Sequence, residues 1–301
     1  MSVFLERLRA GEILLCDGAM GTALTSLGFK TGYEMVSAAL KRPDLIVDIY
    51  RQYVAAGADI IQTHTFSASP DRLREFRLES ATEPLNIAAV RIARSVALPN
   101  TLIAGDIGPS GCFSLSKRYS KPELAQESYQ DQISVLADEG VDLILAETLS
   151  SPEEARIIVE TTRQILPTLP VVLSFHVYGT HQGFKTPLKA TIQEIVAALV
   201  DSPPDALGFN CGSGIDEYIE AVAELRQLTD LPIICQPNAG IPTARQGEWV
   251  WPSSSTYMAE RLPHLLDAGA TVVGGCCGTT AEHIAAFRRV ISMRSDPLSY
   301  N

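Results

Sequence analysis

The chain repeats one pattern eight times along its 301 residues: a short apolar run, a turn and an amphipathic helical stretch. Continuous apolar runs rich in branched aliphatic residues are typical of parallel strands that are covered on both faces. We predict eight such strands, at residues 13–17, 58–66, 101–107, 141–148, 171–177, 206–211, 232–237 and 271–276. Eight β/α units of this length predict an α/β fold, the (β/α)8 TIM barrel.

Helix signals fill the intervals between these strands. Pro43 and Pro122 stand where the first turn of a helix accepts proline, and Gly57 and Gly140 stand where those helices would end. A doubly wound sheet is the alternative architecture. Its phosphate-binding G-x-G-x-x-G turn is missing from the first β/α turn, which reads Asp17-Gly18-Ala19-Met20-Gly21.

Composition narrows the class of protein further. The chain contains no linker or low-complexity segment, so residues 1–301 are expected to form a single barrel domain. A formal charge of −11 argues against a nucleic-acid partner, and no apolar run is long enough to span a membrane. The N-terminus lacks a signal sequence, which predicts a cytoplasmic protein. Six cysteines are too few for a disulfide scaffold and are therefore available for metal.

Polar and sulfur-containing residues collect at the predicted strand ends. The active site of a TIM barrel lies at the C-terminal ends of its strands, so these residues are the candidates for function. In chain order they are Asp17, Thr63, His64, Thr65, Phe66, Asp106, Glu147, Thr148, His176, Asn210, Cys211, Gln236, Asn238, Cys276 and Cys277.

Three of the cysteines have the context of a metal site. Cys211, Cys276 and Cys277 each lie at a predicted strand end within a glycine-rich turn, and a bend at those glycines would let the adjacent pair face one ion. Three sulfur ligands suit Zn²⁺ and leave its fourth position open, as in a catalytic site. The remaining three are interpreted as small residues that fill the core, namely Cys16, Cys112 and Cys235.

Two acids and two histidines leave alternatives open. Asp17 and Glu147 each end a strand, and a carboxylate at that position either pairs with a nearby Arg or Lys or captures a substrate ammonium group. His64 and His176 are either core histidines or members of a metal site that combines two histidines with a cysteine.

These motifs together resemble the zinc-dependent homocysteine S-methyltransferase family. They occur in the family's order across nearly the whole chain, and the Gly-Gly-Cys-Cys-Gly-Thr element is the most specific of them. The matching stretches are residues 17–22, 62–66, 105–109, 146–148, 208–211, 236–242 and 274–280.

The resemblance implies a role for each candidate residue. It implies that Cys211, Cys276 and Cys277 hold Zn²⁺ and that the sulfur of homocysteine takes the fourth position. It further implies that Asp17 and Glu147 receive the amino group and that Thr63 with nearby amides holds the carboxylate. Phe66 would form an aromatic wall, and Asn238 would lie near the open metal position.

The methyl donor is the least constrained part of the reaction. Members that use betaine are expected to box its ammonium with aromatic side chains, but the matching positions hold Glu34, Ser67 and Thr148, and only Phe66 is aromatic. The Pro-Asn-Ala-Gly form at residues 237–240 resembles the homocysteine-binding module of cobalamin-dependent methionine synthase. The expected donor is therefore methylcobalamin or methyltetrahydrofolate, delivered by a cobalamin-carrying protein or module acting in trans or lost from a fragment.

Three alternatives stay open at this point. The first is a homocysteine S-methyltransferase that uses S-methylmethionine or S-adenosylmethionine as a free donor. The second is a related methyltransferase acting on another thiol or on a selenol. The third is a zinc-binding barrel without catalytic activity, although none of the expected site residues is missing from the chain.

Overall fold

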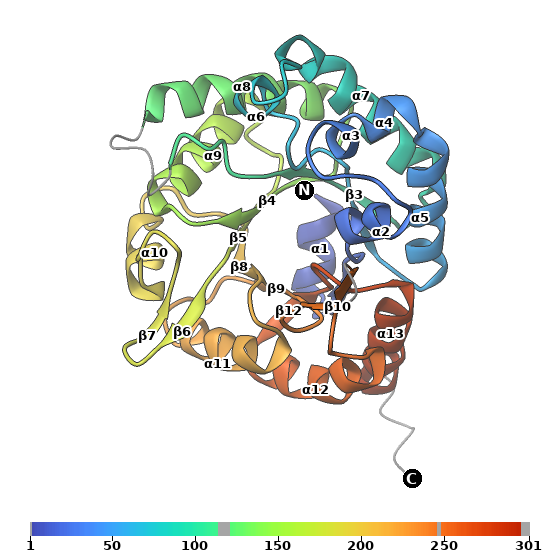
Figure 1. Cartoon of the computed structure of the whole chain (residues 1–301). Helices are drawn as coiled ribbons and strands as arrows, with labels where there is room; N and C mark the ends of the chain where they lie inside the picture. Colours follow the sequence, from blue (N-terminus) through green and yellow to red (C-terminus); the bar gives the residue numbers. More distant parts are fainter. Residues whose placement is uncertain (1, 114–120, 246–247, 296–301) are drawn as a thin grey trace.

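Eight parallel strands form one sheet, in the order β1-β12-β9-β8-β5-β4-β3-β2 (Figure 1). This computed structural model describes residues 2–113, 121–245 and 248–295. The strands are β1 Leu14–Leu15, β2 Ile60–Gln62, β3 Leu102–Ile107, β4 Leu143–Leu149, β5 Val171–Phe175, β8 Ala206–Cys211, β9 Ile233–Pro237 and β12 Ala270–Val273. Parallel pairing in this order confirms the predicted TIM barrel.

The first and second strands close the barrel. Cys16 forms a parallel bridge with Ile60, and the N–H of Asp17 donates to the carbonyl of Ile60 at 3.0 Å. A ring of helices surrounds the strands (Figure 1). These helices are α5 Pro43–Ala55, α7 Thr82–Val96, α8 Pro122–Asp138, α9 Pro152–Ile165, α10 Ile192–Ala198, α11 Ile215–Arg226, α12 Ser255–Asp267 and α13 Ala281–Ser295.

Short helices and two hairpins lie at the ends of the barrel. Helix α1, Val3–Arg9, carries Phe4, which is 1% exposed and packs into the apolar interior of the barrel. The other short helices are α2 Met20–Ser26, α3 Tyr33–Val36, α4 Ala38–Lys41, α6 Pro70–Arg74 and the 3-10 helix η1 Glu79–Ala81. Two hairpins follow, made of β6 Tyr178–Thr180 with β7 Gly183–Lys185, and of β10 Thr243–Arg245 with β11 Glu248–Val250. Of the helices described, none combines the length and the apolar character needed to cross a membrane.

The helix start and stop signals predicted for α5 and α8 coincide with the observed ends of these helices. Helix α5 begins at Pro43 and α8 begins at Pro122, and each ends just before a glycine with a positive φ. Those glycines have φ values of 97° at Gly57 and 75° at Gly140, which L-residues with side chains rarely adopt.

Alternation along the strands separates the barrel interior from the helix-facing layer. In β3, Leu102 and Ala104 belong to the interior cluster, whereas Ile103 packs with the outer core. Side chains two residues apart lie on the same face of a strand, so the interior row of β3 continues to Asp106. The same step leads from Leu145 to Glu147 in β4. The mouth of the barrel is therefore polar above an apolar floor.

Most predicted strands are slightly longer than the observed ones, and the largest differences are at the C-terminal ends of β2 and β12. Strand β2 ends at Gln62 rather than at residue 66, because the N–H of Thr65 turns back to the carbonyl of Thr63 at 2.8 Å. Strand β12 ends at Val273 rather than at residue 276, so Cys276 lies in the following loop. There the chain bends at glycines with no room for a side chain, since a Cβ on Gly275 would lie 2.3 Å from Thr279 Oγ1.

Candidate active site

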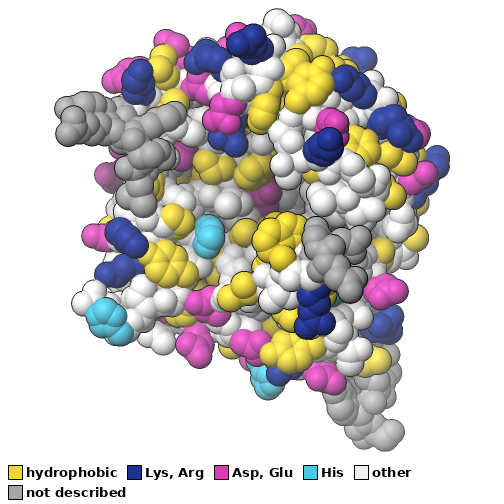
Figure 2. All heavy atoms as spheres, in the orientation of Figure 1, with side chains coloured by type: hydrophobic (Ala, Val, Ile, Leu, Met, Phe, Trp, Pro, Cys, Tyr) yellow, Lys and Arg dark blue, Asp and Glu magenta, His cyan; other side chains and the backbone are white. Residues whose placement is uncertain are grey.

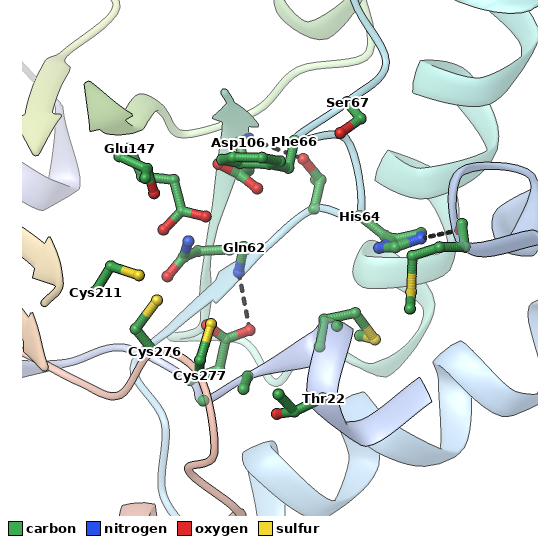
Figure 3. Close-up of a pocket in the computed structure, with 18 of the residues that line it drawn as sticks. Thr22, Gln62, His64, Phe66, Ser67, Asp106, Glu147, Cys211, Cys276 and Cys277 are labelled. Carbon is green, nitrogen blue, oxygen red and sulfur yellow. Dashed lines mark hydrogen bonds between the residues drawn. The ribbon is translucent and has the colours of Figure 1, made fainter. Parts of the chain in front are cut away.

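The three cysteines singled out by the sequence meet at the mouth of the barrel. Cys211 ends β8, and Cys276 and Cys277 lie in the loop after β12. Their Sγ atoms all lie within 4.8 Å of one another, and Figure 3 shows them around one space. Among the residues described, this is the one group of three or more His, Cys, Asp or Glu side chains that could hold a metal ion.

Main-chain hydrogen bonds fix the loop that carries the adjacent cysteines. The N–H of Cys276 donates to the carbonyl of Pro237 at 3.0 Å, and the N–H of Ala239 donates to the carbonyl of Cys277 at 2.9 Å. Gly278 then turns the chain with a φ of 82°. These contacts bring two successive side chains to one side of the loop, which a regular strand cannot do.

The pKa values of the three cysteine thiols are shifted in different directions. Hydrogen bonds from the thiols of Cys276 and Cys277 lower the pKa of Cys211, and the side chain of Asn238 adds a further bond with its Nδ2 atom 3.6 Å from Cys211 Sγ. The same bonds to Cys211 raise the pKa of Cys276, and they raise that of Cys277 to about 12. One thiolate stabilised by two thiols is an arrangement that a bound cation would convert into three thiolates.

A cavity of about 350 Å³ opens beside the cysteines. It lies among the ends of the strands, and Figure 2 shows this face of the molecule hollowed near its centre. The loops after β1 and β2 supply one side of it, including Met20, Met35 and Phe66. Phe66 is the only Phe, Tyr or Trp among the described lining residues, so no aromatic box for a quaternary ammonium is present in that part of the chain.

Three carboxyl groups line this cavity without a basic neighbour. Asp17 Oδ2 accepts the N–H of Gln62 at 3.1 Å, a bond drawn as a dashed line in Figure 3. Glu147 Oε2 accepts the side-chain amide of Asn210 at 3.1 Å. Asp106 is 5% exposed and its Oδ1 atom has no hydrogen-bond partner among the residues described. Within the same residues no Arg or Lys pairs with any of the three, so the structural ion pair considered for Asp17 and Glu147 is not formed.

Burial gives these acids an unusual affinity for protons. Desolvation raises the pKa of Asp17 and of Asp106 well above its ordinary value. Burial raises the pKa of Glu147 to about 7, and the Cys211 thiolate adds to the effect. A ligand that carries positive charge would reverse these shifts, because it stabilises the ionised carboxylates.

The other predicted site residues occupy different positions around the cavity. Thr63 lines it, but its hydroxyl accepts the N–H of Asp106 at 3.0 Å and bonds to the hydroxyl of Thr65 at 2.6 Å. Because Thr65 donates its own proton to the carbonyl of Asp106, the proton of Thr63 goes to Thr65. Asn238 is buried beside Cys211 and does not line the cavity, and its Oδ1 atom lacks a partner among the described residues.

The histidines do not join the metal group. His64 lines the cavity, yet its Nε2 atom bonds to the carbonyl of Met35 at 2.8 Å, and burial lowers its pKa (Figure 3). His176 lies outside the three-cysteine group as well. The alternative of a site with two histidines and one cysteine is therefore wrong for the described residues. The three cysteines predicted to fill core gaps are all buried, namely Cys16, Cys112 and Cys235.

Sequence reasoning named several mouth residues without giving them a role. Asp106, Gln236 and Asn210 each continue an interior row of a strand, so the period of two could have identified all three. The role of Thr279 could not be found in this way, because Thr279 lies in a loop rather than in a strand. Its hydroxyl accepts the N–H of Ala19 at 3.2 Å.

Fold and site together define a class, a (β/α)8 barrel enzyme with a three-cysteine group and buried carboxyls at its mouth. A family model described as homocysteine S-methyltransferase matches residues 14–291. The chain belongs to the homocysteine S-methyltransferase family and is a methyltransferase, as its motifs predicted.

Solved structures agree with this assignment. The metallated form of the homocysteine methyltransferase MmuM from Escherichia coli is 27% identical, with a TM-score of 0.79 over 94% of this chain and 98% of that chain. The oxidized form of the same protein is also 27% identical, with a TM-score of 0.79 over 95% of this chain and 98% of that chain. A type I 3-dehydroquinate dehydratase from Clostridium difficile, 12% identical with a TM-score of 0.52 over 94% and 92%, shares the fold alone.

Proposed function

We propose that this protein methylates the sulfur of L-homocysteine to give methionine, with Zn²⁺ held by Cys211, Cys276 and Cys277. The observation that carries the proposal is the position of the three sulfur atoms, which lie within 4.8 Å of one another beside a cavity lined by buried carboxyls. An all-sulfur donor set suits Zn²⁺, and three protein ligands leave one position for a substrate. When bound, Zn²⁺ would keep the substrate sulfur as a thiolate at neutral pH.

The substrate's charged groups have partners among the lining residues. Asp17 and Glu147 are proposed to receive the ammonium group, because Asp17 is buried, Glu147 is half-buried, and neither forms an ion pair with a described Arg or Lys. Main-chain amides around the cavity are proposed to bind the carboxylate. Thr63 lines that part of the cavity without donating, because its hydroxyl proton goes to Thr65, and Phe66 is proposed to form an apolar wall. Asn238, next to Cys211, remains the candidate for the open metal position when no substrate is bound.

The chemical step is an in-line displacement. The sulfur of homocysteine forms a bond to the methyl carbon while the bond from that carbon to the donor breaks, and the bonding pair leaves with the donor. The protein's contribution is orientation: fixing the ammonium group at Asp17 and Glu147 holds the sulfur in one direction relative to the donor. The apolar side of the cavity excludes water, which would otherwise solvate the attacking sulfur.

Two donors are candidates. The first is methylcobalamin or methyltetrahydrofolate from a partner module, which the Pro-Asn-Ala-Gly form at residues 237–240 favours. A cavity of about 350 Å³ is at the small end for ligand sites, so a corrinoid would have to present its methyl group from the mouth. The second is a free sulfonium donor such as S-methylmethionine or S-adenosylmethionine. The three carboxyls favour it, because their pKa values are raised in the free protein and the positive charge of a sulfonium, added to that of the ammonium group, would let more than one of them ionise.

A donor panel tests the proposal. The purified protein, analysed for zinc, is incubated with L-homocysteine and, separately, methylcobalamin, S-methylmethionine or S-adenosylmethionine, and methionine is measured. Formation of methionine with one donor identifies it. Absence of methionine with all three, from protein that contains zinc, would reject homocysteine methylation and favour another thiol or a selenol.

A single domain over residues 1–301 and a cytoplasmic location remain predictions from the sequence.

A further inference from the structure

Asn210, which the sequence named without a role, connects several functional groups of the site. It lies in β8 directly before Cys211 and its side chain is fully buried, at 0% exposure. Its Oδ1 atom accepts the N–H of Thr148 at 2.7 Å and the hydroxyl of Ser174 at 2.9 Å. These two donors fix the orientation of the amide, so its nitrogen must point toward the site.

The amide nitrogen meets both halves of the proposed substrate site. Asn210 Nδ2 lies 3.1 Å from Glu147 Oε2 and 3.8 Å from Cys276 Sγ. It also donates to the hydroxyl of Thr148 at 2.8 Å. One amide group therefore contacts the carboxylate proposed for the ammonium group and a sulfur atom of the proposed metal site.

The backbone on either side of these contacts is strained. Thr148 has a φ of 60° and Cys211 a φ of 70°, a left-handed conformation that is rare for any residue but glycine and rarest for a β-branched one. Such conformations are unfavourable and persist only where their surroundings impose them. For Thr148 the surroundings are Asn210, which binds both its N–H and its hydroxyl.

The strained backbone at Thr148 directly follows Glu147, whose side chain lines the cavity. The pairing of β4 with β5 shifts register between Ala146 and Leu149, an irregularity centred on Glu147 and Thr148. Bulges of this kind next to active sites change the direction in which a side chain points. Because Asn210 takes the N–H of Thr148, it holds this bulge in place.

We propose that Asn210 is a positioning residue that keeps the Glu147 carboxylate in fixed relation to the metal-binding cysteines. Homocysteine carries its ammonium group and its sulfur on one short chain, so both must be met at a set distance. Asn210 supplies that distance through one rigid amide. The inference rests on the proposed function, since it concerns how the same site recognises homocysteine.

The test compares two thiols that differ only in the ammonium group. Zinc-loaded wild type and Asn210→Asp are titrated with L-homocysteine and with 4-mercaptobutyrate, and the melting temperature is recorded for each protein. Asp keeps the two acceptor contacts of Oδ1 but replaces the amide donor by an oxygen that repels Glu147. We expect L-homocysteine to bind at least tenfold more weakly to the variant, and 4-mercaptobutyrate to change less than threefold.

A matched variant separates positioning from general destabilisation. Asn86→Asp makes the same change at another buried asparagine, whose amide donates to the carbonyls of Ala68 and Thr82. The ratio of the two thiol affinities is expected to stay at the wild-type value there. Should Asn210→Asp not fold, Asn210→Ser removes the same donor with a smaller group and the same selective loss is expected.

The possible results distinguish this inference from the proposed function. Equal weakening for both thiols, with or without loss of zinc, would overturn the role of Asn210, and so would an unchanged preference. If wild-type protein does not prefer L-homocysteine over 4-mercaptobutyrate, the ammonium site itself is wrong and the proposed function fails with it.

Discussion

The hydroxyl of Thr279 donates to the main-chain carbonyl of Cys276 across 2.7 Å, and it also accepts the N–H of Ala19 at 3.2 Å. It thereby joins the loop of the adjacent cysteines to the loop after β1. Thr279→Val keeps the shape but leaves the N–H of Ala19 without its partner and removes one of the two bonds to the carbonyl of Cys276, which keeps the N–H of Thr279. We expect a cost of about 1–3 kcal/mol of folding stability and weaker zinc binding. Denaturant unfolding and zinc titration measure the two effects.

A control for this prediction lies in α9. Thr161 is also buried, but its hydroxyl has no hydrogen-bond partner among the residues described. Thr161→Val should be neutral or stabilising and should leave zinc affinity unchanged. Equal losses in the two variants would show that the hydroxyl of Thr279 has no special role.

Gly278 is expected to be irreplaceable on steric grounds. It has a φ of 82°, and a Cβ there would lie 2.2 Å from Cδ2 of Trp251. Gly140 has a φ of 75° with no atom within 4 Å of such a Cβ, so Gly140→Ala should cost only the backbone strain of about 1–2 kcal/mol. Gly278→Ala should cost more and release zinc. Thermal unfolding with zinc analysis compares them, and similar costs would contradict the clash.

Zinc content should distinguish the three proposed metal ligands from the other cysteines. Cys276→Ser is expected to reduce bound zinc to less than a tenth of the wild-type content, because the site loses one of its three sulfur ligands. Cys235→Ala removes a buried cysteine outside the group and should retain full zinc content with lower stability. Zinc retained in Cys276→Ser would disprove the proposed site.

Ligand binding should depend on pH through Glu147. Its pKa is about 7 in the free protein, and a bound ammonium group favours the carboxylate. As the pH falls below 7, the carboxyl must lose a proton for the ligand to bind, so affinity should fall by up to about tenfold per pH unit. Above pH 7 this dependence disappears.

Methionine is the suitable ligand for this measurement, because it has no thiol proton to lose. The affinity of methionine is measured by calorimetry at pH values from about 5 to about 9. It is compared with the affinity of 4-(methylthio)butyrate, which lacks the ammonium group. The second ligand and the Glu147→Gln variant should both lack the dependence on Glu147. A pH profile for methionine that Glu147→Gln leaves intact would assign the titration to another group.

Strand and helix patterns allowed much of this molecule to be anticipated. The end of a continuous apolar run placed Glu147 at the mouth of the barrel, and proline and glycine signals bounded α5 and α8. The limits of β2 and β12 were wrong because the chain leaves the sheet in tight turns that an apolar run does not mark; after β2 the N–H of Thr65 bonds back to the carbonyl of Thr63. In β12 the cause is Thr279, which occupies the space that a side chain on Gly275 would need.

The sequence by itself determined the barrel, the cysteines at its mouth and the family, because local periodicity and short motifs encode these features. Only the tertiary structure decided which groups at the mouth have partners. Among the residues described, one carboxyl oxygen of Asp106 has no hydrogen-bond partner, whereas the amide nitrogen and the carbonyl oxygen of the Asn210 side chain are both bonded. The physical reason is that hydrogen bonding and desolvation depend on atoms that are far apart in the chain and meet only when the barrel closes.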